Sequence, residues 1–396
     1  MTGTIVIKRE REKPVINQHP WVFSGAIEQV RGNPQPGDIV TVVSERGKFL
    51  ARGYWNPKSQ IQVRLLTWHD EPIDDDWWQR MLRRAIDART SYHDATAYRV
   101  INAENDFIPG LVVDRYGDWL VLQSLTLGIE HRKQMLVNLL AEMLQPQGIY
   151  ERSDVDVRGK EGLREARGLL WGAEPPEQIE IAENDVRLLV NVRTGHKTGY
   201  YLDQADNRRL LPRLLERDPA HRRVLNLFSY TGGFGAHALT LEDASVTNVD
   251  ASYDVLELAE QIYQRNEFPS ERSEFVQADV FDLLRDYVEE REQFDVIVCD
   301  PPKFAHNAQQ VERAARGYKD LNLNCFRLLK PGGCLMTFSC SGAISADLFQ
   351  KIVFGALADT GRQAQILRHL GAGEDHPVAL TFPEGAYLKG LLLRVY

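Results

Sequence analysis

The second half of the chain alternates apolar runs with helical stretches, and this alternation constrains the fold more than any other feature. From about residue 205, five segments have the apolar character of buried strands: 223–229, 246–252, 274–282, 294–300 and 332–339. Helical stretches such as 255–266 and 311–329 separate them. This order predicts a doubly wound parallel sheet, which binds ligands at the carboxyl ends of its strands. Residues 386–396 are expected to add an antiparallel strand.

The first half of the chain predicts smaller parts. Residues 1–72 are β-rich, because 39–55 alternates apolar and polar residues around the turn Glu45-Arg46-Gly47 and 61–68 forms a further strand. Residues 73–180 predict an α+β domain, with helices at 73–90 and 130–144 and a hairpin at 111–125; Trp77 and Trp78 are assigned to its core. Residues 181–204 predict a hairpin connector that turns near Gly195, and 205–396 form the last domain.

Composition favours a soluble cytoplasmic protein. Of the 396 residues, 43% are hydrophobic and 26% are charged, and no apolar run approaches the roughly 20 residues that cross a membrane. Residues 1–13 lack the apolar core of a signal peptide. The four cysteines show no C-x-x-C pairing, so neither a structural metal site nor a disulfide framework is expected.

Charge is distributed unevenly along the chain. The net charge is −9, yet residues 1–72 hold ten Lys and Arg against seven Asp and Glu. This local excess suits a nucleic-acid partner held by patches, and a solvated surface of mixed charge is the alternative. The basic residues are Lys8, Arg9, Arg11, Lys13, Arg31, Arg46, Lys48, Arg52, Lys58 and Arg64.

A nucleotide site is predicted at the carboxyl ends of the first three strands of the last domain. The stretch VLNLFSYTGGFG (224–235) places a glycine turn between a strand and a helix, where the backbone can approach a ligand closely. Asp250 and Asp279 end the next two strands, where they can bind ribose hydroxyls and an adenine amino group. Helix capping is the alternative role of each acid, and NAD fits these features as well as S-adenosylmethionine does.

The motif Asp300-Pro301-Pro302-Lys303 favours S-adenosylmethionine over NAD as the cofactor. Prolines fix φ and remove amide donors, so a stiff backbone can offer a carboxylate and carbonyl oxygens to a flat substrate. Methyltransferases that act on planar nitrogenous substrates need such a device, whereas dehydrogenases do not. Enzymes that methylate nitrogen usually have an aromatic residue after the second proline, where this chain has Lys303.

Cys340, within LMTFSCSG (335–342), favours one target atom. A thiolate that adds to C6 of a pyrimidine makes C5 nucleophilic enough to accept a methyl group. A free thiol has a pKa near 8.5, so its ionisation needs help, and Lys303, a sulfonium or a protonated base could provide it. The alternative is an inert buried cysteine. Cys299, Cys325 and Cys334 are assigned to the core.

Residues 1–72, with HPWVFSGAI (19–27), resemble a PUA domain, which implies RNA binding; a scaffold role is the alternative. The whole chain resembles the bacterial rRNA large-subunit methyltransferase I family, which methylates C5 of a cytosine in 23S rRNA. The motifs are HPWVFSGAI, RSDVDVRGKEGL, GHKTGYYLDQ, LFSYTGGF, DPPKF, RGYKDLN, TFSCSG and PEGAYLKG. The resemblance implies a PUA pseudobarrel, a central α/β domain and a class I methyltransferase domain. It also implies that Cys340 is the nucleophile and that Asp300 contacts the cytosine.

The expected site follows from these motifs. The catalytic residues are Cys340, Asp300 and Lys303, and the cofactor is S-adenosylmethionine. Cofactor contacts are expected from Gln204, Arg208, Phe228, Ser229, Tyr230, Thr231, Gly232, Asp250, Ala251, Ser252, Asp279, Val280, Phe281, Asp300 and Pro301. One departure from the family is Ala205, where arginine is usual, and it leaves Gln204 and Arg208 as candidates for the cofactor carboxylate.

The expected partner is 23S rRNA or a large-subunit assembly intermediate, with a homodimer possible and no membrane partner. Two other functions stay open on the sequence. One is methylation of a guanine or adenine nitrogen, and the other is a non-catalytic RNA-binding assembly factor.

Overall fold

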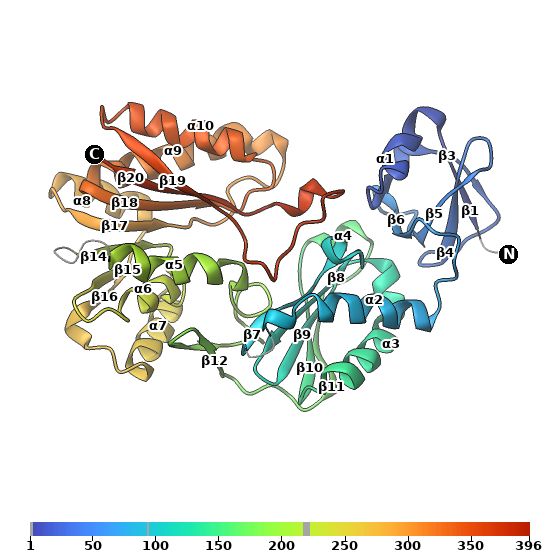
Figure 1. Ribbon diagram of the computed structural model, residues 1–396, viewed down its shortest axis with the longest axis horizontal. Coiled ribbons are helices and arrows are strands. Elements are labelled where there is room, and N and C mark those ends of the chain that lie inside the picture. The colour runs from blue at the N-terminus through green and yellow to red at the C-terminus, as the bar shows by residue number, and fades with distance from the viewer. Residues whose placement is uncertain (1–2, 93–94, 217–221) are drawn as a thin grey trace. The chain divides into compact units, whose positions relative to one another are not determined.

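The computed structural model describes residues 3–92, 95–216 and 222–396. Its contacts divide the chain into two compact units (Figure 1). Unit 1 comprises Met1–Ile181, Val190–Leu202 and Glu374–Gly385; unit 2 comprises Ala182–Leu189, Asp203–Gly373 and Ala386–Tyr396. Within the described ranges, no helix has the length and apolar character needed to cross a membrane.

The first part of unit 1 is a six-stranded sheet with its own apolar core. Its strand order is β2 (Trp21–Phe23), β6 (Ile61–Thr67), β5 (Phe49–Trp55), β4 (Ile39–Ser44), β1 (Thr4–Ile7) and β3 (Ile27–Arg31). Strand β1 runs parallel to β4, and the remaining pairs are antiparallel. The helix α1 (Glu12–Ile16) follows β1. Alternate residues such as Val40 and Val42 point into this core, as the sequence pattern predicts.

The second part of unit 1 is a five-stranded sheet with two long helices. The strand order is β11 (Ala166–Gly172), β10 (Gly148–Ser153), β9 (Trp119–Ser124), β8 (Leu111–Tyr116) and β7 (Ala97–Asn102). The helices are α2 (Asp75–Asp87), α3 (Leu127–Leu144) and the short α4 (Val157–Lys160). Trp77 and Trp78 are buried in this core, so the prediction for them is confirmed.

Residues 374–385 are part of unit 1, although they lie between two strands of unit 2 in the sequence. Arg89 pairs through two nitrogens with Asp106, at 2.7 Å each, and donates to the backbone oxygen of Asp375 at 2.9 Å. The rings of Trp21 and Phe382 pack edge to face, with centroids 4.7 Å apart. Segment 374–385 thus contributes buried partners to a unit whose other residues precede position 203.

The hairpin after residue 178 differs from the expectation. Strand β12 (Ile179–Glu183) pairs with β13 (Val186–Val190), and the chain turns at Asn184 and Asp185 rather than near Gly195. Asn184 has a φ of 55°, a left-handed conformation that asparagine tolerates better than most residues. The glycine near 195 was the more conspicuous turn signal, but it lies in the loop after the hairpin.

Unit 2 confirms the predicted doubly wound sheet. Its seven strands have the order β16 (Ser273–Gln277), β15 (Ser245–Asp250), β14 (Arg223–Leu227), β17 (Phe294–Cys299), β18 (Leu329–Ser339), β20 (Lys389–Val395) and β19 (Ala364–Leu370). The first five are parallel to one another, and β20 is antiparallel to both neighbours. The terminal antiparallel strand is therefore also confirmed.

Helices cover both faces of this sheet (Figure 1). One layer contains α5 (Ala205–Leu215), α6 (Gly233–Ala238) and α7 (Tyr253–Arg265), and the other contains α8 (Val280–Glu289), α9 (Val311–Leu328) and α10 (Ala346–Ala358). The central strands, such as β14 and β17, are apolar on both faces because both faces are buried under helices, whereas the edge strands β16 and β19 are more exposed. Their carboxyl ends are left as the polar edge where chemistry can occur.

Candidate active site

Five loops follow the parallel strands, and they hold most of the residues that the sequence singles out. Because β14 to β18 are neighbours in one parallel sheet, their carboxyl ends meet at the same edge. The loops begin at Phe228, Ala251, Ala278, Asp300 and Cys340. The sheet therefore brings to one edge residues that are far apart in the sequence, such as Phe228 and Cys340, which are separated by 112 positions.

The glycine turn after β14 has an unusual backbone. Phe228 and Tyr230 adopt positive φ values of 55° and 49°, and Gly232 has a φ of 72°. Left-handed backbone at non-glycine residues costs about 1–3 kcal/mol each, and it is concentrated at ligand sites. A Cβ on Gly235 would lie 2.1 Å from the hydroxyl of Tyr263, so the helix that follows the turn can pack closely only without that atom.

Asp250 fixes the turn from the next strand. Its Oδ2 accepts the N–H of Tyr230 at 2.9 Å, and its Oδ1 accepts the N–H of Ser252 at 3.0 Å. Within the described ranges, the buried hydroxyls of Ser229 and Thr231 have no hydrogen-bond partner. Buried polar atoms are normally satisfied, so these two fit a ligand that brings polar groups to the turn. The residues present thus suit a nucleoside cofactor.

Asp279 takes the capping role that the sequence left open for it. Its Oδ1 accepts the N–H groups of Phe281 and Asp282, at 2.8 and 3.3 Å, and so begins α8. A single oxygen makes both bonds, which leaves Oδ2 directed to neither amide. Capping and recognition of an adenine amino group are therefore compatible at this residue.

Gln204 lies beside the Asp-Pro-Pro motif. Its Nε2 donates to Oδ2 of Asp300 at 2.9 Å, and its Oε1 accepts Nδ2 of Asn207 at 2.6 Å. Gln204 makes both hydrogen bonds and is only 2% exposed. Gln204 therefore orients the carboxylate of Asp300, a function that the sequence did not assign to it.

Arg208 is engaged elsewhere. Its Nε and Nη2 donate to the two carboxylate oxygens of Glu183, each at 2.6 Å. Burial of Glu183 opposes its ionisation, but Arg208 and then His237 outweigh burial and keep the pKa of Glu183 below its usual value. A guanidinium in such a bidentate pair is a weak candidate for the cofactor carboxylate.

Cys340 lies at the Asp-Pro-Pro motif. Its Sγ is 4.0 Å from the backbone oxygen of Pro301, and the residue is partly exposed at the end of β18. The serines on either side are fully buried. Ser339 donates to the hydroxyl of Tyr318 at 2.9 Å, and Ser341 lies 3.1 Å from the same hydroxyl. The flanking serines thus anchor the backbone while the thiol stays accessible.

The same network reaches the Asp-Pro-Pro loop. The N–H of Ala305 donates to Oγ of Ser341 at 3.1 Å. One tyrosine and two serines therefore tie α9, the end of β18 and the loop after β17 together. Lys303 is exposed on that loop, and its positive charge acts on a second lysine, Lys389.

Lys389 is a residue of this site that sequence reasoning missed. Its ammonium donates to the backbone oxygens of Ser341 and Ile344, at 2.7 and 2.8 Å, and the residue is 8% exposed. Burial lowers its pKa, the Cys340 sulfur raises it and Lys303 lowers it, to a net value of about 8. The signal was a lysine at the first position of the terminal strand, before a run of three leucines.

The other cysteines lie in the core, as predicted. Cys299 is 0% exposed and sits in the apolar layer under α9. Hydrogen bonding with Cys325 and then burial raise the pKa of Cys299 well above its usual value, so it stays a neutral thiol. Cys325 and Cys334 are also buried. Among the four cysteines, Cys340 alone is partly exposed.

Part of the basic patch expected in residues 1–72 is not at the surface. Arg64 is buried, and its guanidinium pairs with Glu104 at 2.6 Å and with Glu161 at 2.9 Å. Arg52 pairs with Asp70. Including Arg64 among surface charges was therefore wrong, because its charge is neutralised in the protein interior. Arg9, Arg11, Lys13, Arg31, Arg46, Lys48 and Lys58 are exposed.

Known proteins agree with this architecture. A family model described as a PUA-like domain matches residues 5–68, and one described as an S-adenosylmethionine-dependent methyltransferase matches residues 163–394. Two solved structures cover all of this chain and are covered fully by it. One is a methyltransferase complexed with SAH, at 22% identity and a TM-score of 0.85; the other is a SAM-dependent methyltransferase from Streptococcus mutans, at 21% and 0.84.

Curated relatives match from end to end under one name, ribosomal RNA large subunit methyltransferase I. The protein from Tolumonas auensis is 48% identical over 399 residues, with 100% of both chains covered. The protein from Aeromonas hydrophila is 47% identical with the same coverage, and that from Salmonella arizonae is 46% identical over 99% of this chain and 97% of its own. The chain therefore belongs to the ribosomal RNA large subunit methyltransferase I family, S-adenosylmethionine-dependent enzymes with a PUA-like domain.

Proposed function

We propose that this protein methylates C5 of a specific cytosine in 23S rRNA, through a covalent bond between Cys340 and C6 of the ring. The observation that supports it most is the 4.0 Å separation between the Cys340 sulfur and the backbone oxygen of Pro301. A partly exposed thiol beside Asp300 has no use in nitrogen methylation, whereas C5 chemistry requires it. The curated relatives are named for large-subunit rRNA, which supports the choice of substrate.

In this proposal the residues act in a fixed order. Asp300, oriented by Gln204, accepts hydrogen bonds from the cytosine edge and places C6 next to the thiol. The Cys340 thiolate adds to C6, and the electron pair of the C5–C6 bond becomes available at C5. S-adenosylmethionine, when bound, would supply the electrophilic methyl group that this carbon accepts. A base then removes the C5 proton, the C5–C6 double bond re-forms and the thiolate leaves.

The cofactor would lie on the glycine turn. Ser229, Thr231 and the backbone around Gly232 would meet it there, with Asp250 and Asp279 available for the ribose and adenine. Lys303 and Lys389 are positive charges that favour the thiolate form of Cys340, because an opposite charge nearby stabilises an anion.

The decisive experiment uses RNA in which cytosine is replaced by 5-fluorocytosine. Fluorine cannot leave as a proton does, so the wild-type protein should accumulate a covalent protein–RNA adduct, seen as a shifted band on a denaturing gel. Cys340→Ala should form no adduct and lose methyl transfer by more than the roughly 10²–10⁴-fold expected for loss of a general acid or base.

Cys299→Ala is the matched control, because that thiol is 0% exposed and should be dispensable for the adduct. If Cys299→Ala abolishes the adduct and Cys340→Ala keeps it, the wrong thiol has been assigned. If both variants methylate RNA normally, nitrogen methylation becomes the better proposal.

A further inference from the structure

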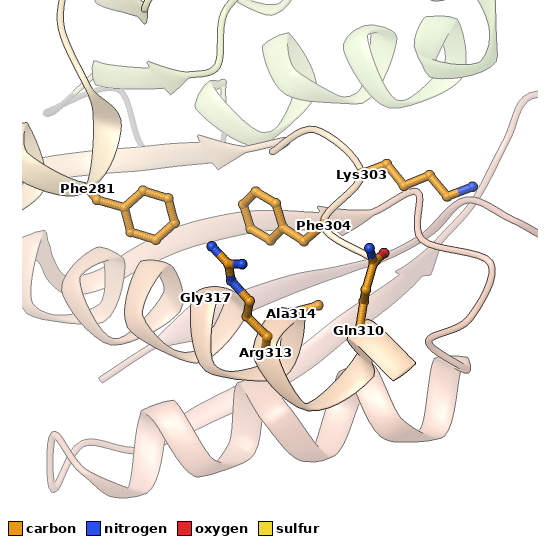
Figure 2. A pocket seen from close by; sticks show the side chains of 7 residues that line it. All are labelled: Phe281, Lys303, Phe304, Gln310, Arg313, Ala314 and Gly317. Atoms are coloured by element: carbon orange, nitrogen blue, oxygen red, sulfur yellow. The ribbon is translucent and has the colours of Figure 1, made fainter. Parts of the chain in front are cut away.

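A cavity of about 390 Å³ opens at the loop after the Asp-Pro-Pro motif, and apart from Lys303 its lining residues have no part in the proposed reaction. It lies between the start of α8, the loop after the Asp-Pro-Pro motif and the first half of α9 (Figure 2). The lining residues are Phe281, Lys303, Phe304, Gln310, Arg313, Ala314 and Gly317.

Two phenyl rings dominate the cavity. The ring centroids of Phe281 and Phe304 are 6.1 Å apart, and the rings are inclined by 36°. Phe304 also packs on Tyr318, with centroids 4.8 Å apart, so its ring is held by the same tyrosine that anchors the thiol loop. Rigid aromatic faces of this kind stack on nucleic-acid bases whatever their sequence.

Positive charge accompanies the rings. Arg313 and Lys303 are exposed, and no carboxylate within 4.0 Å pairs with either of them in the described part of the chain. Figure 2 shows the Arg313 side chain rising from α9 toward the rings, whereas Lys303 extends away from them along the loop. The neighbouring acid, Glu312, is paired with Arg316 at 2.7 Å. A cation that points toward aromatic rings and has no carboxylate partner suits an anionic ligand.

Gly317 is the third observation. A glycine inside a helix costs about 0.5–1 kcal/mol relative to alanine. Here a Cβ would lie 3.5 Å from the Phe304 ring and 3.9 Å from Phe281, which are ordinary van der Waals contacts. Packing alone therefore does not require glycine in the middle of α9. A longer side chain at this position would extend into the cavity, so glycine keeps the cavity open.

We propose that this cavity binds an unpaired RNA base adjacent to the target cytosine, stacked on Phe281 or Phe304, with its phosphate at Arg313. The inference rests on the proposed function for the presence of an RNA substrate. S-adenosylmethionine is a poorer partner for Arg313, because its sulfonium is a cation, whereas each nucleotide of RNA brings one negative phosphate. An extruded neighbour would also help to hold the target base at the thiol.

Gly317→Leu tests the proposal, and Gly317→Ala is its matched control. Both changes favour the helix, but only leucine fills the cavity. The substrate is unmodified 23S rRNA made by transcription, with methyl transfer followed from labelled S-adenosylmethionine. Stacking of one base corresponds to roughly a five- to hundredfold effect, so Gly317→Leu should raise KM for the RNA by that factor. S-adenosylmethionine affinity, measured by calorimetry, should change less than twofold, and Gly317→Ala should match the wild type.

Arg313→Ala provides a second readout that does not depend on Gly317→Leu folding, because its side chain is exposed. It should weaken RNA binding several-fold and reduce the slope of log K against log salt by about 0.7, the value for one phosphate of a single strand. An unchanged RNA affinity in both variants would overturn the proposal. Loss of S-adenosylmethionine affinity in Gly317→Leu would assign the cavity to the cofactor instead. The Cys340 adduct is measured separately, so base binding in the cavity can be supported even if the methylated atom is not C5.

Discussion

Residues near the thiol differ in how far the sequence could predict them. Asp300 and Cys340 could be located because each directly follows an apolar strand, and parallel strands end at one edge. Lys389 could not, since its place depends on the antiparallel register that sets it opposite Ser339. Arg64 was misassigned for a similar reason: its partners Glu104 and Glu161 are 40 and 97 positions away.

Lys389→Met should separate the charge of this side chain from its bulk. The pKa of Lys389 is about 8 in the folded protein and 10.5 ordinarily, so the unfolded chain binds more protons between these pH values. Stability conferred by Lys389 should therefore rise with pH over that window. The free energy of unfolding of both proteins is measured with urea at pH 7 and pH 10. The wild-type value minus the variant value should be larger at pH 10. A difference that is constant with pH would show that the lysine pKa is not depressed.

At the level of elements, the apolar runs predicted every strand of the parallel sheet, and the signal is strongest for the central strands such as β14 and β17, which are buried on both faces. The sequence pattern failed at the hairpin of β12 and β13, because the turn uses Asn184 instead of glycine. Apolar periodicity also could not predict the contact of α9 with the thiol loop, because a tyrosine in an amphipathic helix gives the same pattern as any other core residue.

Tyr318→Phe should test whether α9 positions the thiol. The change removes a hydroxyl bonded to Ser339 and Ser341, so the end of β18 loses a tie to the helix. We expect kcat to fall roughly ten- to hundredfold, the scale of a small misplacement of reacting groups, with S-adenosylmethionine affinity unchanged. Tyr287→Phe, on the same apolar cluster, is the control and should remain active. Equal kcat values for the two variants would refute a positioning role for Tyr318.

At the scale of the whole molecule, the sequence indicates an acidic chain with a local excess of basic residues in its amino-terminal part. Burial of one of those basic residues decides how RNA binding by this part can be tested. Cutting the chain at residue 72 would leave Glu104 and Glu161 without Arg64, and uncompensated buried charges are strongly destabilising. Surface charge reversal is the cleaner test of RNA binding by this part.

The triple change Arg9→Glu, Arg11→Glu and Lys13→Glu should weaken 23S rRNA binding and flatten its dependence on salt, because fewer counterions are released. All three side chains are exposed near α1. The control reverses the same number of exposed charges on unit 2: Arg265, Arg327 and Lys351. Filter binding over a range of salt concentrations measures both. Equal slopes for the two triple variants would mean that net charge alone, rather than this surface, governs RNA affinity.

The inclusion of segment 374–385 in unit 1 also has a consequence during synthesis. Arg89 is made early, but its acceptor at Asp375 is 286 positions later. Contacts this distant in sequence close slowly, and amino-terminal parts of long chains begin to fold while the ribosome is still translating. Unit 1 therefore cannot complete its folding until almost the last residue has been translated. In a nascent chain stalled before codon 374, unit 1 should stay incompletely folded and accessible to proteases and chaperones.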